Sequence, residues 1–288
     1  MSTITLIDDS EQSSLVTNGL AKNGEMYLKK AGSTDAGSIV VYDSGVWKGF
    51  ANEAVSFTNA YSVDFDGTND YMSVPDADAF SLGDGLGTDS AFSISAWFNA
   101  DSIGTFHIAT KDLTYSNREW AFRTVSSKLH FFAFGTGGGY IGRNYSTTLS
   151  TGQWYHAVVT YDASKASSGL KLYLNGTRVD DGDYASGTYG AGRNTSTLVR
   201  VGSQEGGNSY SNGKIDEVSV FSSELSASNV TSIYNSGVPS DISSLSPVAW
   251  WRMGDDDSGT GTTITDQGSG SNDGTLTNGP VFSSDVPS

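Results

Sequence analysis

The chain of 288 residues is 36% hydrophobic and 17% charged, contains 35 glycines but no cysteine, and carries a formal net charge of −16. This acidic balance disfavours nucleic acid and anionic lipid as partners, and the lack of cysteine excludes disulfides and thiol chemistry. No apolar run approaches the roughly 20 residues that cross a membrane, and the polar start MSTITLIDDSEQ lacks the features of a signal peptide. We therefore expect synthesis in the cytoplasm and no membrane insertion.

The first predicted segment, residues 1–56, is small and rich in β-strand. Two short apolar runs at 38–42 and 46–50 flank the turn residues Asp43-Ser44-Gly45, which predicts a hairpin. A hairpin of this size is not stable alone, so we expect the segment to serve attachment or oligomerisation.

The main domain is predicted at residues 57–238, where apolar and polar residues alternate. In 92–98, Phe92, Ile94, Ala96 and Phe98 share one face, as expected for a strand with one face in a core. In 153–161 both faces are apolar, and the run 170–174 ends at Asn175-Gly176, a strong hairpin signal. About ten short strands at this spacing favour a sandwich or a barrel. Further strands are predicted near 61–66, 70–74, 104–111, 119–124, 128–134, 198–202 and 214–221.

One helix is predicted near the end of this domain. Ser226 is a suitable N-cap, Val230, Ile233 and Tyr234 share a face, and Gly237 can end the helix in the left-handed conformation.

Residues 239–288 form the third predicted segment, an acidic C-terminal extension with seven acidic residues and only one basic residue, Arg252. A strand is predicted at 248–253. Trp250 and Trp251 lie side by side in a polar setting, so they must either be buried or mark a contact surface. We predict that they form an interface between subunits.

Four stretches in order, Phe65–Tyr71, Phe92–Phe98, 153–176 and 213–218 with the short helix after it, resemble the LamG-like jelly-roll family of the concanavalin A-like lectin/glucanase superfamily. The resemblance implies an all-β fold, a two-sheet antiparallel jelly-roll sandwich with small β-rich extensions at both ends. It also implies that one sheet binds glycan or protein, and that structural calcium lies near the ends of the first and last strands. The family is functionally broad, so fold alone does not give the function.

The C-terminal stretches 249–254, 263–266 and 272–276 resemble the lead-in that usually precedes such a domain, although here they follow it. They supply a strand either to their own sandwich or to a neighbouring subunit. This arrangement, with the hairpin at 39–50, is similar to LamG-containing structural proteins of marine bacteriophage particles. The resemblance implies a place on the virion exterior, on capsid or tail, with other virion proteins or copies of the same chain as partners.

Three aspartates are the predicted calcium ligands. Asp216 is expected in phase with Val218 and Val220 on an apolar face, where a carboxylate must be paired or bound to metal. The family pattern places a ligand there, and Asp66 and Asp70 are expected to supply the opposing oxygens. A solvated Asp216 and a simple turn at Asp66 are the alternatives.

Three clusters of aromatic and arginine residues are the candidate glycan-binding sites, since such residues anchor ligands well. They are Tyr115, Arg118 and Trp120; Tyr140, Arg143 and Tyr145; and Tyr189 and Arg193.

We predict a non-enzymatic virion structural protein that presents a LamG-like domain outward, with cell-surface glycan as a candidate ligand. The first alternative is a stand-alone lectin or adhesin. The second is a glycoside hydrolase, which the sequence disfavours because the paired glutamates of glucanases are absent and 215–218 contains a single one, Glu217.

Overall fold

The computed structural model describes residues 5–7, 26–29, 39–43, 46–50 and 57–288 except 208; for the residues before 57 and for Tyr115 it describes the backbone only. The chain divides into two compact units, residues 1–57 and 58–288. Among the described residues no helix is long and apolar enough to cross a membrane.

The first unit contains a four-stranded sheet in the order β1-β2-β3-β4. β1 and β2 are parallel, whereas the other neighbours are antiparallel. The pair predicted within 39–50 is present as β3 and β4. The strands are β1 (Thr5–Ile7), β2 (Met26–Lys29), β3 (Ile39–Asp43) and β4 (Val46–Phe50).

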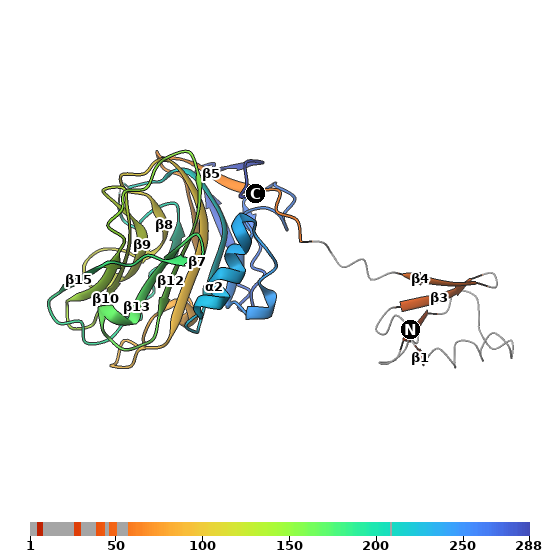
Figure 1. Cartoon of the computed structure of the whole chain (residues 1–288), viewed down its shortest axis with the longest axis horizontal. Helices are drawn as coiled ribbons and strands as arrows, with labels where there is room; N and C mark the ends of the chain where they lie inside the picture. The colour runs from red at the N-terminus through yellow and green to blue at the C-terminus, as the bar shows by residue number, and fades with distance from the viewer. Residues whose placement is uncertain (1–4, 8–25, 30–38, 44–45, 51–56, 208) are drawn as a thin grey trace. The chain divides into compact units, whose positions relative to one another are not determined.

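The second unit is a sandwich of two antiparallel sheets (Figure 1). The nine-stranded sheet has the order β15-β11-β10-β9-β8-β16-β6-β20-β19. Its strands are β6 (Tyr71–Val74), β8 (His107–Asp112), β9 (Arg118–Val125), β10 (Lys128–Phe134), β11 (Tyr140–Asn144), β15 (Gly182–Ser186), β16 (Val199–Val201), β19 (Thr263–Ile264) and β20 (Gly274–Thr277).

The eight-stranded sheet has the order β14-β13-β12-β7-β17-β5-β21, and β18 also pairs with β17. Its strands are β5 (Ser62–Asp66), β7 (Phe92–Ser102), β12 (Trp154–Tyr161), β13 (Leu170–Leu174), β14 (Thr177–Arg178), β17 (Asn212–Phe221), β18 (Ala249–Trp251) and β21 (Val281–Ser283). The predicted all-β sandwich is therefore confirmed. Short 3-10 helices lie at Asp78–Phe80, Tyr115–Asn117, Ser167–Gly169, Asn235–Gly237 and Ser243–Leu245.

The core lies between the two sheets and follows the alternation of the sequence. Phe92, Ile94, Ala96 and Phe98 of β7 all belong to it, as predicted. The turn after β13 has positive φ at both Asn175 and Gly176, 49° and 76°, which is the backbone of a tight hairpin.

The α2 helix (Ala227–Tyr234) lies beside the eight-stranded sheet, on the side away from the core (Figure 1). Ser226 caps its N-terminus through the backbone N–H of Asn229, at 3.1 Å. The helix ends earlier than predicted, because Asn235 takes the left-handed conformation before Gly237 is reached. Tyr234 stacks on the rings of Trp97 and His156, with centroids 5.7 and 5.9 Å away.

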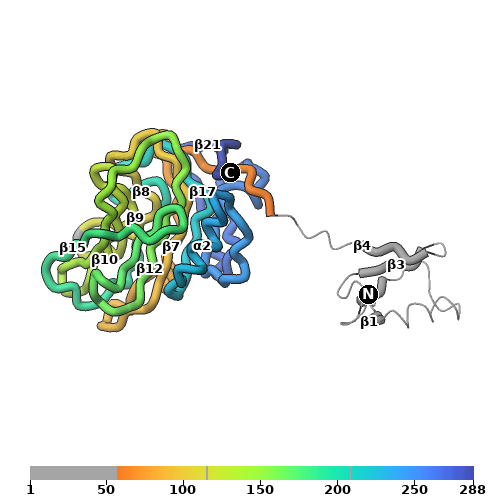
Figure 2. The backbone as a smooth tube through the Cα atoms, in the orientation of Figure 1, coloured from red at the N-terminus to blue at the C-terminus, as the bar shows by residue number. Residues whose placement is uncertain are grey.

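Residues 239–288 are part of the sandwich, since they add β19 and β20 to one sheet and β18 and β21 to the other. Figure 2 shows this C-terminal part of the chain beside β17 and α2. Trp251 is fully buried and its Nε1 donates to the carbonyl oxygen of Asn272 at 2.8 Å, while Trp250 is 5% exposed. The prediction of a subunit interface at these two rings is corrected accordingly, because they are buried within a single chain.

Candidate functional site

The outer face of the nine-stranded sheet carries aromatic and arginine side chains. In β10, Leu129, Phe131 and Ala133 point into the core. Successive strand residues point to opposite faces, so Phe132 and Phe134 lie on the outer face. Strand pairing then places Tyr140 of β11 opposite Phe134, and Arg123 of β9 opposite His130.

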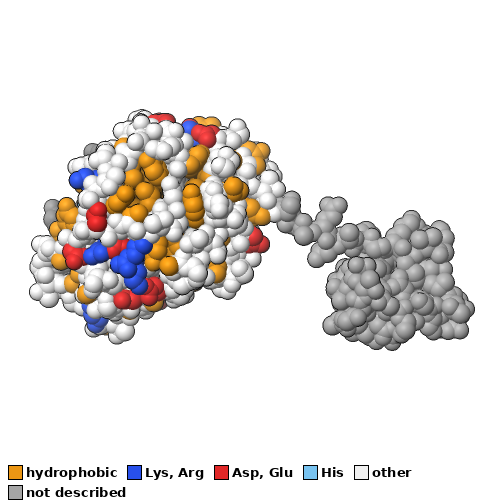
Figure 3. All heavy atoms as spheres, in the orientation of Figure 1, with side chains coloured by type: hydrophobic (Ala, Val, Ile, Leu, Met, Phe, Trp, Pro, Cys, Tyr) orange, Lys and Arg blue, Asp and Glu red, His pale blue; other side chains and the backbone are white. Residues whose placement is uncertain are grey.

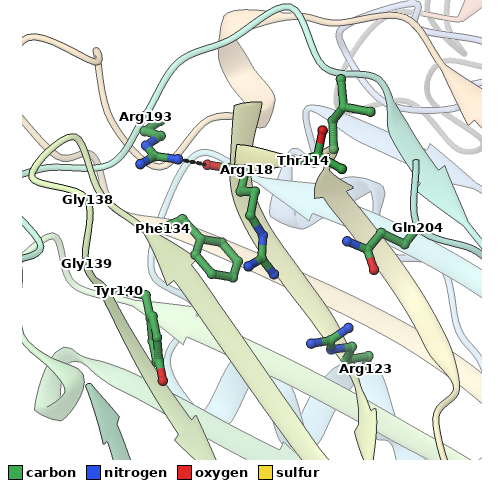
Figure 4. Close-up of a pocket in the computed structure, with 10 residues that line it drawn as sticks. Thr114, Arg118, Arg123, Phe134, Gly138, Gly139, Tyr140, Arg193 and Gln204 are labelled. Atoms are coloured by element: carbon green, nitrogen blue, oxygen red, sulfur yellow. Dashed lines mark hydrogen bonds between the residues drawn. The ribbon is translucent and has the colours of Figure 1, made fainter. Parts of the chain in front are cut away.

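A pocket of about 630 Å³ opens at one end of this face, where the loops after β8 and β10 meet. We name it the arginine–aromatic pocket (Figure 4). Its lining residues are Leu113, Thr114, Arg118, Arg123, Phe134, Gly138, Gly139, Tyr140, Arg193 and Gln204.

Arg118 and Phe134 form the centre of the pocket. The guanidinium carbon of Arg118 lies 3.8 Å from the centroid of the Phe134 ring, and the centroids of Phe134 and Tyr140 are 5.8 Å apart. Figure 4 shows these side chains directed into a common space with Gln204 on the opposite side. Phe134 is only 7% exposed and Arg118 covers one face of its ring, so the ring that the pocket offers beside planar hydrogen-bonding groups is the half-buried Tyr140.

Hydrogen bonds hold the arginines in position before any ligand binds. Arg118 makes a two-pronged ion pair with buried Asp112, from Nε to Oδ1 at 2.7 Å and from Nη2 to Oδ2 at 3.1 Å. Such forked pairs fix the plane of a guanidinium. Arg193 Nη1 donates to the backbone carbonyl of Arg118 at 3.4 Å (Figure 4).

Arg123 lies deeper on the same face. Its guanidinium carbon is 5.5 Å from the Phe132 ring centroid, and its pairing partners are His107 and His130. Burial lowers the pKa of Arg123 and lowers that of each histidine to about 4; the charge of Arg123 also lowers both histidine pKa values. At neutral pH the histidines are therefore uncharged and the arginine supplies the local charge.

The loop after β10 leaves room for a ligand. Gly138 has φ of +85°, and a Cβ built there would meet no atom within 4 Å. At Gly139, in contrast, a Cβ would lie 2.3 Å from the carbonyl oxygen of Ser186. The loop therefore packs closely through Gly139 while Gly138 faces open space at the pocket.

The pocket unites one residue from each of the three predicted glycan clusters, Arg118, Tyr140 and Arg193. The sequence did not indicate Arg123, Phe134 or Gln204. The alternation in 128–134 carried a signal for Phe134, since it places this ring opposite the core residues.

The other predicted binding residues are not part of this pocket; burial corrects the assignments of Trp120 and Tyr189, and binding at Arg143 and Tyr145 stays a prediction. Trp120 is fully buried and donates to the carbonyl oxygen of Phe80, and Tyr189 is 6% exposed and donates to Asp89. Arg143 is paired with two aspartates, Asp180 and Asp183, and Tyr145 packs against the core. The side chain of Tyr115 lies outside the described residues.

The three predicted calcium ligands do not form one group. Asp66 Oδ1 accepts the N–H groups of Thr68 and Asn69, and Asp70 Oδ2 accepts the N–H of Asp66 at 3.2 Å. Asp66 pairs with Asn212, four residues from Asp216 along β17, which is roughly 13 Å. No group of three His, Cys, Asp or Glu side chains within the described parts of the chain could hold a metal ion. The three residues thus do not fit a shared calcium site, and calcium at Asp66 and Asp70 stays a prediction.

A β-bulge explains why the predicted phase of Asp216 is wrong. The pairing of β17 with β7 shifts between Asp216 and Ser219, and Glu217 has φ of 48°. Ile215, Val218 and Val220 consequently face the core. Asp216 is buried and accepts the Nδ2–H of Asn59 at 3.0 Å.

Glu217 is enclosed by the C-terminal segment. It accepts hydrogen bonds from Trp250 Nε1 at 2.5 Å and from Arg252 Nε at 3.1 Å. Burial raises the pKa of Glu217 to about 7, against the opposing effect of Arg252, and raises that of Asp216 well above its usual range. Only about 10 Å³ of space adjoins Glu217, so no substrate can reach it in this conformation.

The distribution of charged side chains on the visible surface differs from that in the pocket. On the face shown in Figure 3, most of the larger unit is uncharged, and Lys and Arg side chains lie next to Asp and Glu. The pocket instead gathers three arginines and no acidic side chain among its lining residues.

Residues 66–231 match the family model described as the concanavalin A-like lectin/glucanases superfamily, Laminin_G_3. No curated protein sequence matches the chain.

Two solved structures are similar to the chain, and the fold is shared with the first of them. A proposed carbohydrate-binding protein from Bacteroides ovatus ATCC 8483 is 18% identical with a TM-score of 0.55, over 92% of this chain and 71% of that one. The heptameric SAP-like pentraxin of Limulus polyphemus is 13% identical with a TM-score of 0.42, over 61% of this chain and 82% of that one.

Proposed function

Because the chain belongs to the concanavalin A-like lectin/glucanases superfamily, we propose that it binds carbohydrate in the arginine–aromatic pocket and does not hydrolyse it. The observation that carries the proposal is the placement of the half-buried Tyr140 ring beside Arg118 and Gln204 in one open pocket. A sugar ring has an apolar C–H face and a rim of hydroxyls, which match an aromatic ring and planar hydrogen-bonding groups respectively. Ligand sites in general combine apolar walls with a few well-placed polar groups.

The absence of acidic lining residues supports binding without catalysis. Glycoside hydrolysis normally requires two carboxyl groups within about 5–10 Å of each other around the scissile bond, and no lining residue of the pocket is Asp or Glu. Elsewhere, Glu217 has a pKa suited to an acid catalyst, but Trp250 and Arg252 occupy its carboxylate.

A glycan array followed by titration calorimetry with the full chain tests the proposal. Tyr140→Ala removes a ring, and Gly138→Asn introduces a side chain into open space while keeping a residue that tolerates positive φ. Each should weaken binding by about ten-fold or more. Arg178→Gln is the control, because Arg178 is exposed and lies on the other sheet.

Unchanged affinity in both pocket variants, with unchanged melting temperature, would contradict the pocket as the site. Release of new reducing ends from a bound glycan would contradict a purely binding role.

We propose further that the chain is a structural component on the exterior of a bacteriophage particle, where it presents this domain. The sequence resemblance to LamG-containing virion proteins supports this role, and so does the division into two compact units, since the first can attach while the second binds. Mass spectrometry of purified particles should detect the chain, and light scattering should detect a homo-oligomer. Absence of the chain from particles would contradict the proposal.

A further inference from the structure

Three arginines, Arg118, Arg123 and Arg193, line the pocket, and no Asp or Glu is among its lining residues. Arg118 is paired with Asp112. This local positive charge contrasts with the net charge of −16 for the whole chain. A ligand with negative charge is therefore attracted to the pocket and repelled by much of the remaining surface.

The Arg123 side chain forms no ion pair within the described part of the chain. Its Nε is buried without a hydrogen-bond acceptor. Arg123 is only partly buried and lines the pocket, so a ligand oxyanion can pair with the terminal nitrogens of its guanidinium.

A second such arginine lies further along the same face. Arg200 of β16 lies over the Tyr71 ring, 4.0 Å from its centroid, and its Nε likewise has no acceptor. Strand pairing places Arg200 level with Ala121 across β8, and Arg123 lies two residues further along β9, so the Cα atoms of the two arginines are roughly 12 Å apart. This span exceeds one sugar ring, and an extended chain can contact both.

We propose that the carbohydrate bound at this face is an acidic polysaccharide, whose carboxylate or sulfate groups pair with Arg123 and Arg200. The inference rests on the proposed function and specifies its ligand class. Both oxyanions accept two parallel hydrogen bonds from a guanidinium. Because the Nε atoms of both arginines are buried, the edge formed by the two terminal nitrogens of each guanidinium makes this contact.

Pairs of glycans that differ only in charge distinguish the contribution of the charged groups to binding from that of the sugar rings. Titration calorimetry with the full chain would compare a polyuronate with its carboxyl-reduced form, and a sulfated galactan with its desulfated form. At least one charged form should bind about ten-fold or more tightly than its neutral partner. This preference should decline as NaCl rises from about 50 to 500 mM, because salt screens exposed charges.

Two variants test whether Arg123 and Arg200 are the residues that recognise the charged groups of the glycan. Arg123→Gln should reduce affinity for the charged glycan about ten-fold more than affinity for the neutral form, whereas Arg178→Gln should change neither. Arg200→Gln should weaken long charged oligosaccharides but not disaccharides. Arg123 forms no ion pair within the described residues, although the nearby charge of Asp112 favours its charged form, so its replacement should change the melting temperature little. A measured melting temperature equal to that of wild type would exclude misfolding as the cause of lost binding.

The outcomes distinguish the two proposals. Equal binding of a charged glycan and its neutral partner would overturn the acidic ligand while the carbohydrate proposal stands. Binding of no glycan in either form would overturn both. Equally tight binding of single-stranded DNA would show plain attraction to polyanions, and would overturn the assignment of an acidic polysaccharide.

Discussion

Glu217→Gln should make the protein more stable than wild type at alkaline pH but not at mildly acidic pH. The carboxyl of Glu217 is buried between Trp250 and Arg252, and burial raises its pKa from 4.5 to about 7. The folded chain therefore keeps a proton that the unfolded chain releases. This stabilisation is fully present below about pH 4.5 and is lost as pH rises through about 7.

The size of this change in stability follows from the linkage between proton binding and folding. Between about pH 5.5 and 7 only the unfolded chain has ionised Glu217, and each pH unit is worth about 1.4 kcal/mol, so wild type should lose about 2 kcal/mol by pH 8.5. Glutamine does not titrate and still offers an oxygen to Trp250 Nε1. In a unit of this size the difference corresponds to about 4–8 °C in melting temperature.

Urea unfolding at pH 5.5, 7 and 8.5 should compare the variant with wild type at each pH. Burial lowers the pKa values of His107, His130 and His156. These residues therefore destabilise the folded chain as pH falls below about 6.5, which is the opposite of the pH dependence that Glu217 contributes. They are present in both proteins and cancel in the difference. Glu224→Gln, in a partly exposed ion pair with Lys171, is the control.

A difference that stays constant from pH 5.5 to 8.5 would refute the reasoning. An increase in the stability of wild type relative to the variant as pH rises would also refute it. That result would mean that the ion pair with Arg252 outweighs the cost of burying the charged Glu217.

Three further predictions concern the second unit. Trp251→Ala should lower the free energy of unfolding by about 3–5 kcal/mol, because the ring is fully buried in the core; a loss under about 1 kcal/mol in urea unfolding would contradict its place there. If calcium binds at Asp66 and Asp70, EDTA should lower the melting temperature in differential scanning fluorimetry, and an identical temperature would contradict the calcium prediction. Residues 58–288 alone should unfold cooperatively and keep the glycan affinity of the full chain; an unfolded fragment would refute the independence of this unit.

Local features of the sequence predicted local features of the fold. The alternation in 92–98 identified the core face of β7, and Asn175-Gly176 marked a real hairpin. β15 was missed, because Gly182–Ser186 is a polar edge strand that is mostly exposed. Its pairing with β11 depends on backbone groups rather than on apolar side chains.

The pocket depends on contacts that the sequence does not encode locally. Arg118, Tyr140 and Arg193 meet because β9, β10 and β11 are neighbours and the loop before β16 returns to them. The predicted face of Asp216 was wrong for a different reason. Alternation assumes a regular strand, and one extra residue at the bulge changes the face of every residue before it.

The most direct test of the account is a crystal structure of the full chain with the tightest-binding oligosaccharide. We predict that a sugar ring lies against Tyr140, within hydrogen-bond distance of Arg118, and that an acidic group of the ligand pairs with Arg123. A sugar bound elsewhere on the sandwich, with this pocket empty, would contradict the central claim.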